Sequence, residues 1–154
     1  MKYVTDYVIE EVTRQGHKTT VPEDGFARVV YMLNAWQYAL VHEHHNPTVD
    51  DIRIMGRLVE PDKNPNGFRR CGVMVGIRVC PNWQRVPDLL VTLFEQMPDY
   101  ADRPIAFYKE FEMIHPFIDG NGRTGKVLLN WLNHTLDAPV FPPADLWGRP
   151  IRNP

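Results

Sequence analysis

Hydrophobic residues recur at helical spacing over most of the chain. Val4, Val8 and Val12 lie four residues apart, which predicts a short amphipathic helix over residues 2–13. The same period, close to 3.6 residues, predicts a core-facing helix over residues 26–41. Both segments therefore predict helices that bury one face against a common core.

The later segments continue this pattern. Thr48 is placed to cap a helix in which Ile52, Met55 and Val59 share one face. Pro104 is suited to the first turn of another helix. Further apolar runs at helical spacing cover residues 89–97, 105–114 and 127–136.

Residues 60–83 break the helical pattern. They contain early prolines, an Asn-Gly turn at 66–67 and short runs of Val, Ile and Phe, which predict an irregular loop with a small β-hairpin. The predicted fold class is mainly α, a compact helical bundle with a small β-hairpin flap. Three parts are expected: an N-terminal helix and linker (1–25), a core (26–140) and a proline-rich tail (141–154).

Composition excludes several classes of protein. The chain has 154 residues, 44% of them hydrophobic, which is enough for one packed domain. Its net charge is −2 and it has no basic run, so no nucleic acid partner is expected. It has no run of about 18 apolar residues, so no membrane span is expected. It contains no serine, which excludes a Ser–His–Asp hydrolase.

The segment HPFIDGNGRTGK, residues 115–126, concentrates polar chemistry between two apolar helical runs. Gly120 and Gly122 leave backbone N–H groups uncovered where a helix begins, and such a helix start binds anions. Arg123 and Lys126 add positive charge where phosphates would lie.

Two further residues of this segment suit catalysis. Asp119 is a hard oxygen ligand for Mg²⁺, and His115 has a pKa in the range of a general base. Together with the anion site they indicate phosphate-ester transfer from a nucleotide. The alternative is a glycine-rich connection with a capping aspartate and a surface histidine.

The segment resembles the signature of the Fic family, His-Pro-Phe-x-(Asp/Glu)-Gly-Asn-Gly-Arg-x-x-Arg. Every specified position agrees except the last, which is Lys126. The flanking segments extend the resemblance over residues 26–140. It implies a protein adenylyltransferase that moves AMP from ATP to a Ser, Thr or Tyr hydroxyl of a target protein, with Mg²⁺ as cofactor.

The resemblance also implies roles for single residues. His115 would be the catalytic base, Asp119 the metal ligand and Phe117 a buried anchor. The nucleotide would be bound by Gly120, Asn121, Gly122, Arg123 and Lys126.

A flap that aligns the target chain by strand pairing is implied for the segment after residue 66. Its residues would be Gly67, Phe68, Arg69, Arg70, Val73 and Val75. From the residues alone, Arg69 and Arg70 could instead hold a substrate phosphate or protect an exposed strand edge.

Lys126 departs from the family pattern. A lysine is a point charge without the fork of arginine, and we expect it to reach the distal phosphate of the nucleotide. The departure keeps other reactions open: phosphorylation as in Doc-type toxins, UMP transfer, or a catalytically weak binding module.

Regulation and location are also expectations. Residues 19–24, TTVPED, match the family's inhibitory pattern only in part, so a toxin-like protein restrained by a separate antitoxin-like inhibitor is expected. The chain has two cysteines, which we expect to be reduced thiols and not a disulfide. The protein is therefore expected in the cytoplasm, or delivered into another cell. His42 and His45 could pair on a metal, or be solvated residues at a helix end.

Overall fold

The computed structural model describes residues 2–143, and most of these residues are helical. The six α-helices are α1 (Lys2–Arg14), α2 (Ala27–His42), α3 (Val49–Val59), α4 (Val86–Glu95), α5 (Pro104–Ile114) and α6 (Asn121–Leu132). One antiparallel hairpin pairs β1 (Met74–Val75) with β2 (Arg78–Val79). The predicted fold class, a mainly α bundle with a small β-hairpin, is confirmed.

Three short helical turns complete the described structure. The predicted linker contains a π-helical turn at Pro22–Phe26. Trp83–Arg85 forms a 3-10 turn that leads into α4, and Met97–Tyr100 forms another one after it. Most of the predicted proline-rich tail lies outside the described residues.

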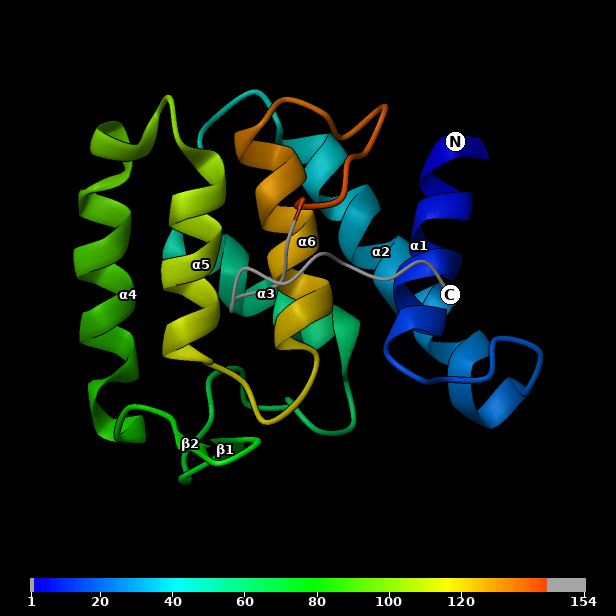
Figure 1. The fold of residues 1–154 in the computed structure, drawn as a ribbon, viewed down its shortest axis with the longest axis horizontal. Coiled ribbons are helices and arrows are strands. Elements are labelled where there is room, and N and C mark those ends of the chain that lie inside the picture. Colours follow the sequence, from blue (N-terminus) through cyan, green and yellow to red (C-terminus); the bar gives the residue numbers. More distant parts are fainter. Residues whose placement is uncertain (1, 144–154) are drawn as a thin grey trace.

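Helix α6 occupies the middle of the molecule. In Figure 1, α5 and α4 lie on one side of α6, α1 lies on the other, and α2 and α3 lie behind it. Ten of its twelve residues are buried, so α6 faces neighbours on nearly all sides. The residues that open α6 are therefore held by the packing of the whole bundle.

The amphipathic faces predicted from the sequence form the core. Val4, Val8 and Val12 of α1 are buried, so α1 packs into the same core as the later helices. At the start of α3, Thr48 and Asp51 form the capping box that fixes where this helix begins. No helix among residues 2–143 is long and apolar enough to cross a bilayer.

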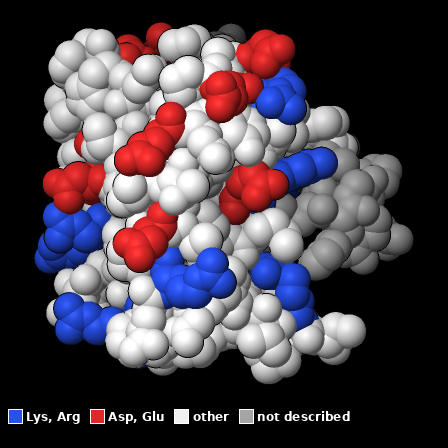
Figure 2. Space-filling model, turned by 90° about the vertical axis from the view of Figure 1, so that its left-hand side faces the viewer, with Lys and Arg blue, Asp and Glu red and all other residues white. Residues whose placement is uncertain are grey.

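Charged side chains are unevenly spread over one face. Figure 2, which views the molecule from the α4 side, shows Asp and Glu mainly in the upper half and Lys and Arg gathered below. Figure 1 places the β1–β2 hairpin and the α5–α6 connection at this lower end. The end of the bundle that carries the motif is therefore the more basic one on this face.

Helix α3 supports the α5–α6 connection through a glycine. Phe117 is fully buried, and its ring lies over Gly56 so closely that a Cβ there would be 2.1 Å from Cζ. Phe68 contacts the same ring, with 5.5 Å between ring centroids. Burying a phenylalanine stabilises by about 1.5–3 kcal/mol, so this contact anchors the connection.

We expect Gly56→Ala to destabilise the protein although alanine is the better helix former. The added methyl would overlap the Phe117 ring, and overpacking of this kind costs about 1–3 kcal/mol. The free energy of unfolding from urea denaturation measures the effect. Gly72→Ala is the matched control, because a Cβ at Gly72 has no neighbour within 4 Å. Equal stability of the two variants would contradict the prediction.

Candidate active site

The backbone of the α5–α6 connection is fixed at both ends. His115 ends α5 with φ 53° and ψ 63°, a left-handed conformation that a residue with a side chain seldom adopts. Gly120, with φ 77°, precedes α6. Between them, the side chain of Asn121 accepts from the N–H of Phe117 (2.9 Å) and donates to its carbonyl (3.0 Å). The connection is therefore preformed.

The start of α6 provides an anion site made of backbone. No side chain caps this helix, so the N–H groups of its first turn have no acceptor within it. Gly120 and Gly122 add no side chain of their own there, although the side chain of Gln15 lies 3.1 Å from where a Cβ of Gly122 would stand. The helix dipole favours negative charge at this position. This backbone arrangement suits the predicted anion loop, in which Asn121 would contribute its backbone while its side chain holds Phe117.

His115 is half-buried and is neutral at physiological pH. Burial lowers the pKa of its imidazole to about 4, and the positive charges of Arg78 and Arg69 lower it further. A hydrogen bond to the Glu112 carbonyl acts in the opposite direction. A neutral imidazole next to an anion site can accept a proton, which is the chemistry predicted for this residue.

Asp119 stands beside the start of α6 as a carboxylate. Its Oδ2 accepts from Lys63 Nζ at 2.7 Å, and its Oδ1 accepts from the Gly120 N–H at 2.7 Å. Burial alone would raise the pKa of Asp119, but these contacts and the charge of Arg123 hold it below its ordinary value. Ionised oxygen is the ligand that Mg²⁺ prefers.

The donor set around Asp119 fits a metal held jointly with a nucleotide. Among residues 2–143 no group of three or more His, Cys, Asp or Glu could hold an ion by itself. Mg²⁺ commonly takes one or two carboxylates and completes its shell with phosphate oxygens and water. A single carboxylate next to an anion site matches that mode, and Lys63 now neutralises the charge that the metal would neutralise.

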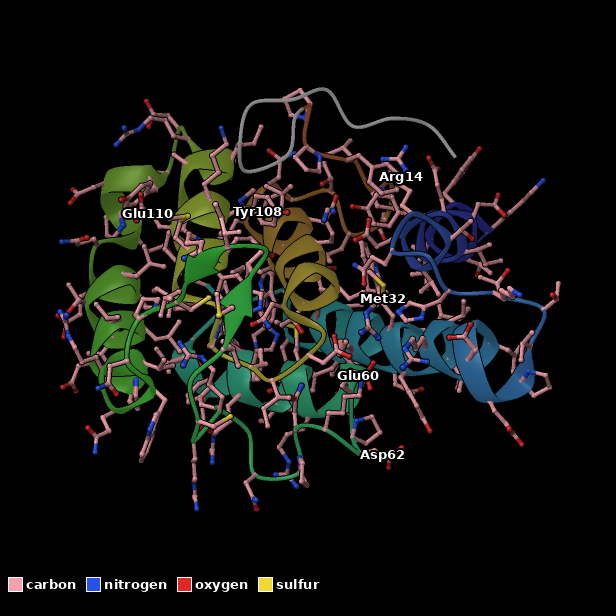
Figure 3. The ribbon with its side chains drawn as sticks, turned by 60° about the horizontal axis from the view of Figure 1, so that its bottom comes forward. Arg14, Met32, Glu60, Asp62, Tyr108 and Glu110 are labelled. Atoms are coloured by element: carbon pink, nitrogen blue, oxygen red, sulfur yellow. The ribbon has the colours of Figure 1, made fainter. Side chains whose placement is uncertain are left out.

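Arg123 is fully buried, although it is expected to contact the nucleotide. Its Nη2 donates to Glu60 at 2.8 Å and its Nε donates to Gln15 at 3.1 Å, with Asp119 3.6 Å away. Figure 3 shows Glu60 beside the start of α6. Glu60 also pairs with Arg28. Nη1 of Arg123 has no hydrogen-bond partner among the described residues, which leaves one donor for an anion.

Lys126, predicted to contact a nucleotide phosphate, is paired within the protein. It is buried, and its Nζ donates to Glu11 of α1 at 3.2 Å and lies 5.5 Å from the ring centroid of Tyr108. Burial would lower the pKa of Lys126, but the carboxylates of Glu11 and Glu112 raise it above its ordinary value. This side of α6 faces α1 and α5, and the contact of Lys126 with a nucleotide stays a prediction.

The predicted flap is displaced along the sequence. The hairpin strands cover residues 74–79, so Val75 is the one predicted flap residue in a strand. Five predicted residues lie in the loop before it: Gly67, Phe68, Arg69, Arg70 and Val73. The turn between the strands presents Ile77 at 97% exposure, and Arg78 ties β2 to the Met113 carbonyl (3.2 Å).

Arg69 lies outside the strands and contacts the protein's own backbone. Its buried guanidinium donates to the carbonyls of His115 (2.7 Å), Pro81 (2.6 Å), Cys71 (3.0 Å) and Ile114 (3.3 Å). These carbonyls belong to the end of α5 and to both arms that lead into the hairpin. Arg69 therefore joins the hairpin to the residue predicted as the catalytic base.

The segment resembling the inhibitory pattern does not contact the motif. Asp24 accepts from the N–H of Lys18 at 2.8 Å and from the ring of His17 at 2.9 Å, and it pairs with Arg28. These contacts close the turn between α1 and α2. Instead, Glu11 of α1 and Gln15, which follows α1, contact the first two turns of α6.

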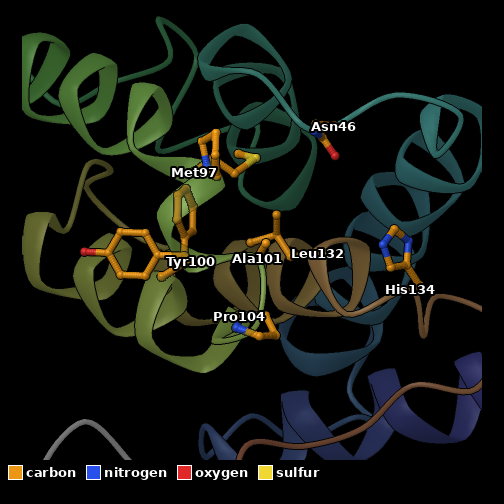
Figure 4. A pocket seen from close by; sticks show the side chains of 9 residues that line it. Asn46, Met97, Tyr100, Ala101, Pro104, Leu132 and His134 are labelled. Carbon is orange, nitrogen blue, oxygen red and sulfur yellow. The ribbon is translucent and has the colours of Figure 1, made fainter.

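A hollow of about 210 Å³ lies at the end of α5 and α6 that is opposite the motif (Figure 4). Its lining includes Asn46, Met97, Tyr100, Pro104, Leu132 and His134. Among the described residues, its lining has no Asp, Glu, Lys or Arg. Within residues 2–143 no group of three or more possible ligands forms around His42 and His45, and zinc sites usually have at least three protein ligands.

Comparisons with known proteins agree with this geometry. Residues 41–133 match the model of the Fic/DOC family. A probable protein adenylyltransferase of Aquifex aeolicus is 38% identical over 73 residues, which are 43% of this chain and 23% of that protein. The protein adenylyltransferase fic-1 of Caenorhabditis briggsae is 35% identical over 102 residues, 59% of this chain and 20% of that protein.

A solved structure of Fic-1 from Caenorhabditis elegans resembles the fold with a TM-score of 0.68. The two sequences are 21% identical, and the match covers 92% of this chain and 51% of that one. At this identity the likeness concerns the fold. The chain spans about a fifth of the length of the curated relatives it matches.

We expect Lys126→Met to lower the free energy of unfolding by about 3–5 kcal/mol, because it leaves the Glu11 carboxylate buried without its cation. Adding Glu11→Gln should recover part of the loss, since the unpaired charge is then removed. Urea denaturation of both single variants and the double variant measures the coupling. Lys18→Met, at an exposed position, is the control. Purely additive losses would show that the pair is not coupled.

Proposed function

The chain belongs to the Fic/DOC family, and from this premise we propose that it is a protein adenylyltransferase that transfers AMP from ATP to a hydroxyl side chain of a target protein. The observation that carries the proposal is the pairing of a neutral His115 with an anion-binding helix start and an ionised Asp119. Relatives with this activity in their names support it.

The chemistry divides among the residues of the motif. The α-phosphate of ATP is held by the backbone N–H groups that open α6, which stabilise the charge that builds up on its oxygens. The hydroxyl oxygen of the target forms a bond to the α-phosphorus, the bond to the bridging oxygen of the β-phosphate breaks, and pyrophosphate leaves. His115 accepts the hydroxyl proton at the ring nitrogen that is not bonded to the Glu112 carbonyl.

Asp119 would hold Mg²⁺ against the phosphates. The metal supplies charge neutralisation for the leaving pyrophosphate. To hold the metal, the Asp119 carboxylate would have to give up or share its contact with Lys63. Arg123 stays in its pair with Glu60 and offers Nη1 to the nucleotide.

The acceptor and the setting are part of the same proposal. The acceptor is a Ser, Thr or Tyr of a protein target laid along the exposed β1–β2 hairpin. The protein acts in the cytoplasm, its own or that of a cell into which it is delivered, where ATP is abundant. We further propose that a separate inhibitor restrains it as a toxin, because Asp24, the last residue of the segment 19–24, is engaged with His17, Lys18 and Arg28.

Transfer from labelled ATP tests the reaction. In lysate, ATP labelled at the α-phosphate should label a protein target, whereas ATP labelled at the γ-phosphate should not. His115→Ala should reduce this label by about 10²–10⁴-fold, as loss of a general base does. His134→Ala is the matched control, because His134 has the same left-handed backbone at an exposed site. Label from the γ-phosphate would indicate phosphorylation, and no label from either would leave a binding module.

The pH dependence tests the state of His115. Because its pKa is lowered to about 4, the neutral base persists well below the ordinary value of 6.5. We expect kcat/KM for ATP to stay level from pH 8 down to about 5 and to fall at lower pH as the imidazole is protonated. Arg78→Gln should move this fall to higher pH, since the charge of Arg78 lowers the pKa of His115. A fall centred near 6.5 in the unmodified protein would contradict the assignment.

A further inference from the structure

A groove leads away from the motif on the side of the loop before the hairpin. Two adjoining hollows of about 200 and 280 Å³ form it. Their shared walls are Asn66, Phe68, Arg69 and Arg70. The first hollow reaches Ile118 within the motif, and the second ends at Trp83. We call this continuous hollow the Arg70 groove.

The Arg70 groove has one cation available to a ligand. Among the four that line it, Arg69 donates to backbone carbonyls, Lys63 is bound to Asp119 and Arg53 is bound to Asp50. Arg70 is exposed and has neither an ion pair nor a hydrogen bond within residues 2–143. Arg70 lines both hollows, so a peptide bound in either hollow would lie near its guanidinium.

Negative charge is scarce around Arg70. Of the residues that the structure describes, Asp62, at the motif end, is the only carboxylate in the lining, and Figure 3 shows it on the outer edge of the molecule. The second hollow has no acidic residue among the described residues that line it. Figure 2 shows basic side chains gathered toward this end of the face that it views. The electrostatic field along the groove therefore favours an anionic ligand.

The walls fit a polypeptide. Trp83 is 37% exposed and, with Phe68 and Pro87, gives the second hollow apolar surface. Ile118, 49% exposed, begins the groove directly beside Asp119. A chain whose hydroxyl lies at His115 can thus continue over Ile118 and past Arg70 toward Trp83.

We propose that the Arg70 groove binds an acidic stretch of the protein target next to the modified hydroxyl. The proposal rests on the proposed function, because it adds a preference for acidic sequence to the transfer reaction. Arg70 would pair with an Asp or Glu side chain, and Trp83 would pack against the peptide that carries it. The groove would then act as a specificity element beside the hairpin.

The distribution of charge favours an acidic peptide over a nucleic acid. Nucleic acid binding relies on several phosphate contacts, each made by an available Lys or Arg. Here three of the four cations are engaged within the protein and the chain has a net charge of −2. One unpaired arginine beside an aromatic wall suits a single carboxylate on a flexible chain.

Peptide binding without nucleotide tests the proposal. The probes are two fluorescein-labelled peptides, each with one threonine followed by a run of glutamates or by the same number of glutamines. By fluorescence anisotropy, the unmodified protein should bind the glutamate peptide more tightly, and Arg70→Gln should weaken that binding about tenfold, the effect of losing one charge-assisted contact. Arg57→Gln, an exposed arginine one turn beyond Arg53 that does not line the groove, should change nothing.

Trp83→Ala should weaken both peptides equally, because it removes apolar contact and not charge. Equal binding of the two peptides, no binding of the glutamate peptide at millimolar protein, or equal effects of Arg57→Gln and Arg70→Gln would each overturn the proposal. Displacement of the peptide by Mg-ATP would assign the groove to the donor, and displacement by oligouridylate would assign it to RNA. Failure of AMP transfer with Arg70-dependent binding intact would refute the proposed function alone.

Discussion

The guanidinium of Arg69 is the contact on which the site depends. Among the described residues no carboxylate pairs with this buried group. Its N–H groups donate instead to four backbone carbonyls, from the end of α5 and from the segments on both sides of the hairpin. The last carbonyls of a helix lack intrahelical donors and carry its negative dipole end, so a cation there satisfies both needs. Because one of these carbonyls belongs to His115, Arg69 also holds the left-handed turn that presents the imidazole.

The start of α6 is held in a comparable way by carboxylates from other helices. Glu60, at the end of α3, pairs with Arg123 and with Arg28, while Glu11 of α1 pairs with Lys126. Replacing such pairs by apolar residues need not destabilise a protein, but removing one partner does. These pairs therefore fix how α1, α3 and α6 are oriented at the anion site.

Features of the fold that depend on local sequence pattern could be predicted from the sequence. The helices follow from apolar spacing, the start of α3 from Thr48, and the anion loop from glycines before a helical run. Contacts between distant residues do not follow from such patterns: Lys126 and Glu11 are 115 residues apart, and Arg69 and His115 are 46 apart. A charged residue in a sequence gives no sign of whether its partner is a nucleotide or a buried carboxylate. For this reason the sequence pattern favours a phosphate contact for Lys126 and leaves a substrate phosphate or a strand edge open for Arg69.

Nearby cations hold the two titratable groups of the motif in the states that the proposed reaction needs. Arg78 and Arg69 add to the burial of His115 and keep it neutral, while Lys63 and Arg123 keep Asp119 ionised. A proton acceptor and a metal ligand thus coexist within five residues of sequence because positive charge disfavours protonation of both. The arriving nucleotide brings negative charge that offsets these cations and raises the proton affinity of His115. Binding of the donor would therefore strengthen the base at the moment a hydroxyl must lose its proton.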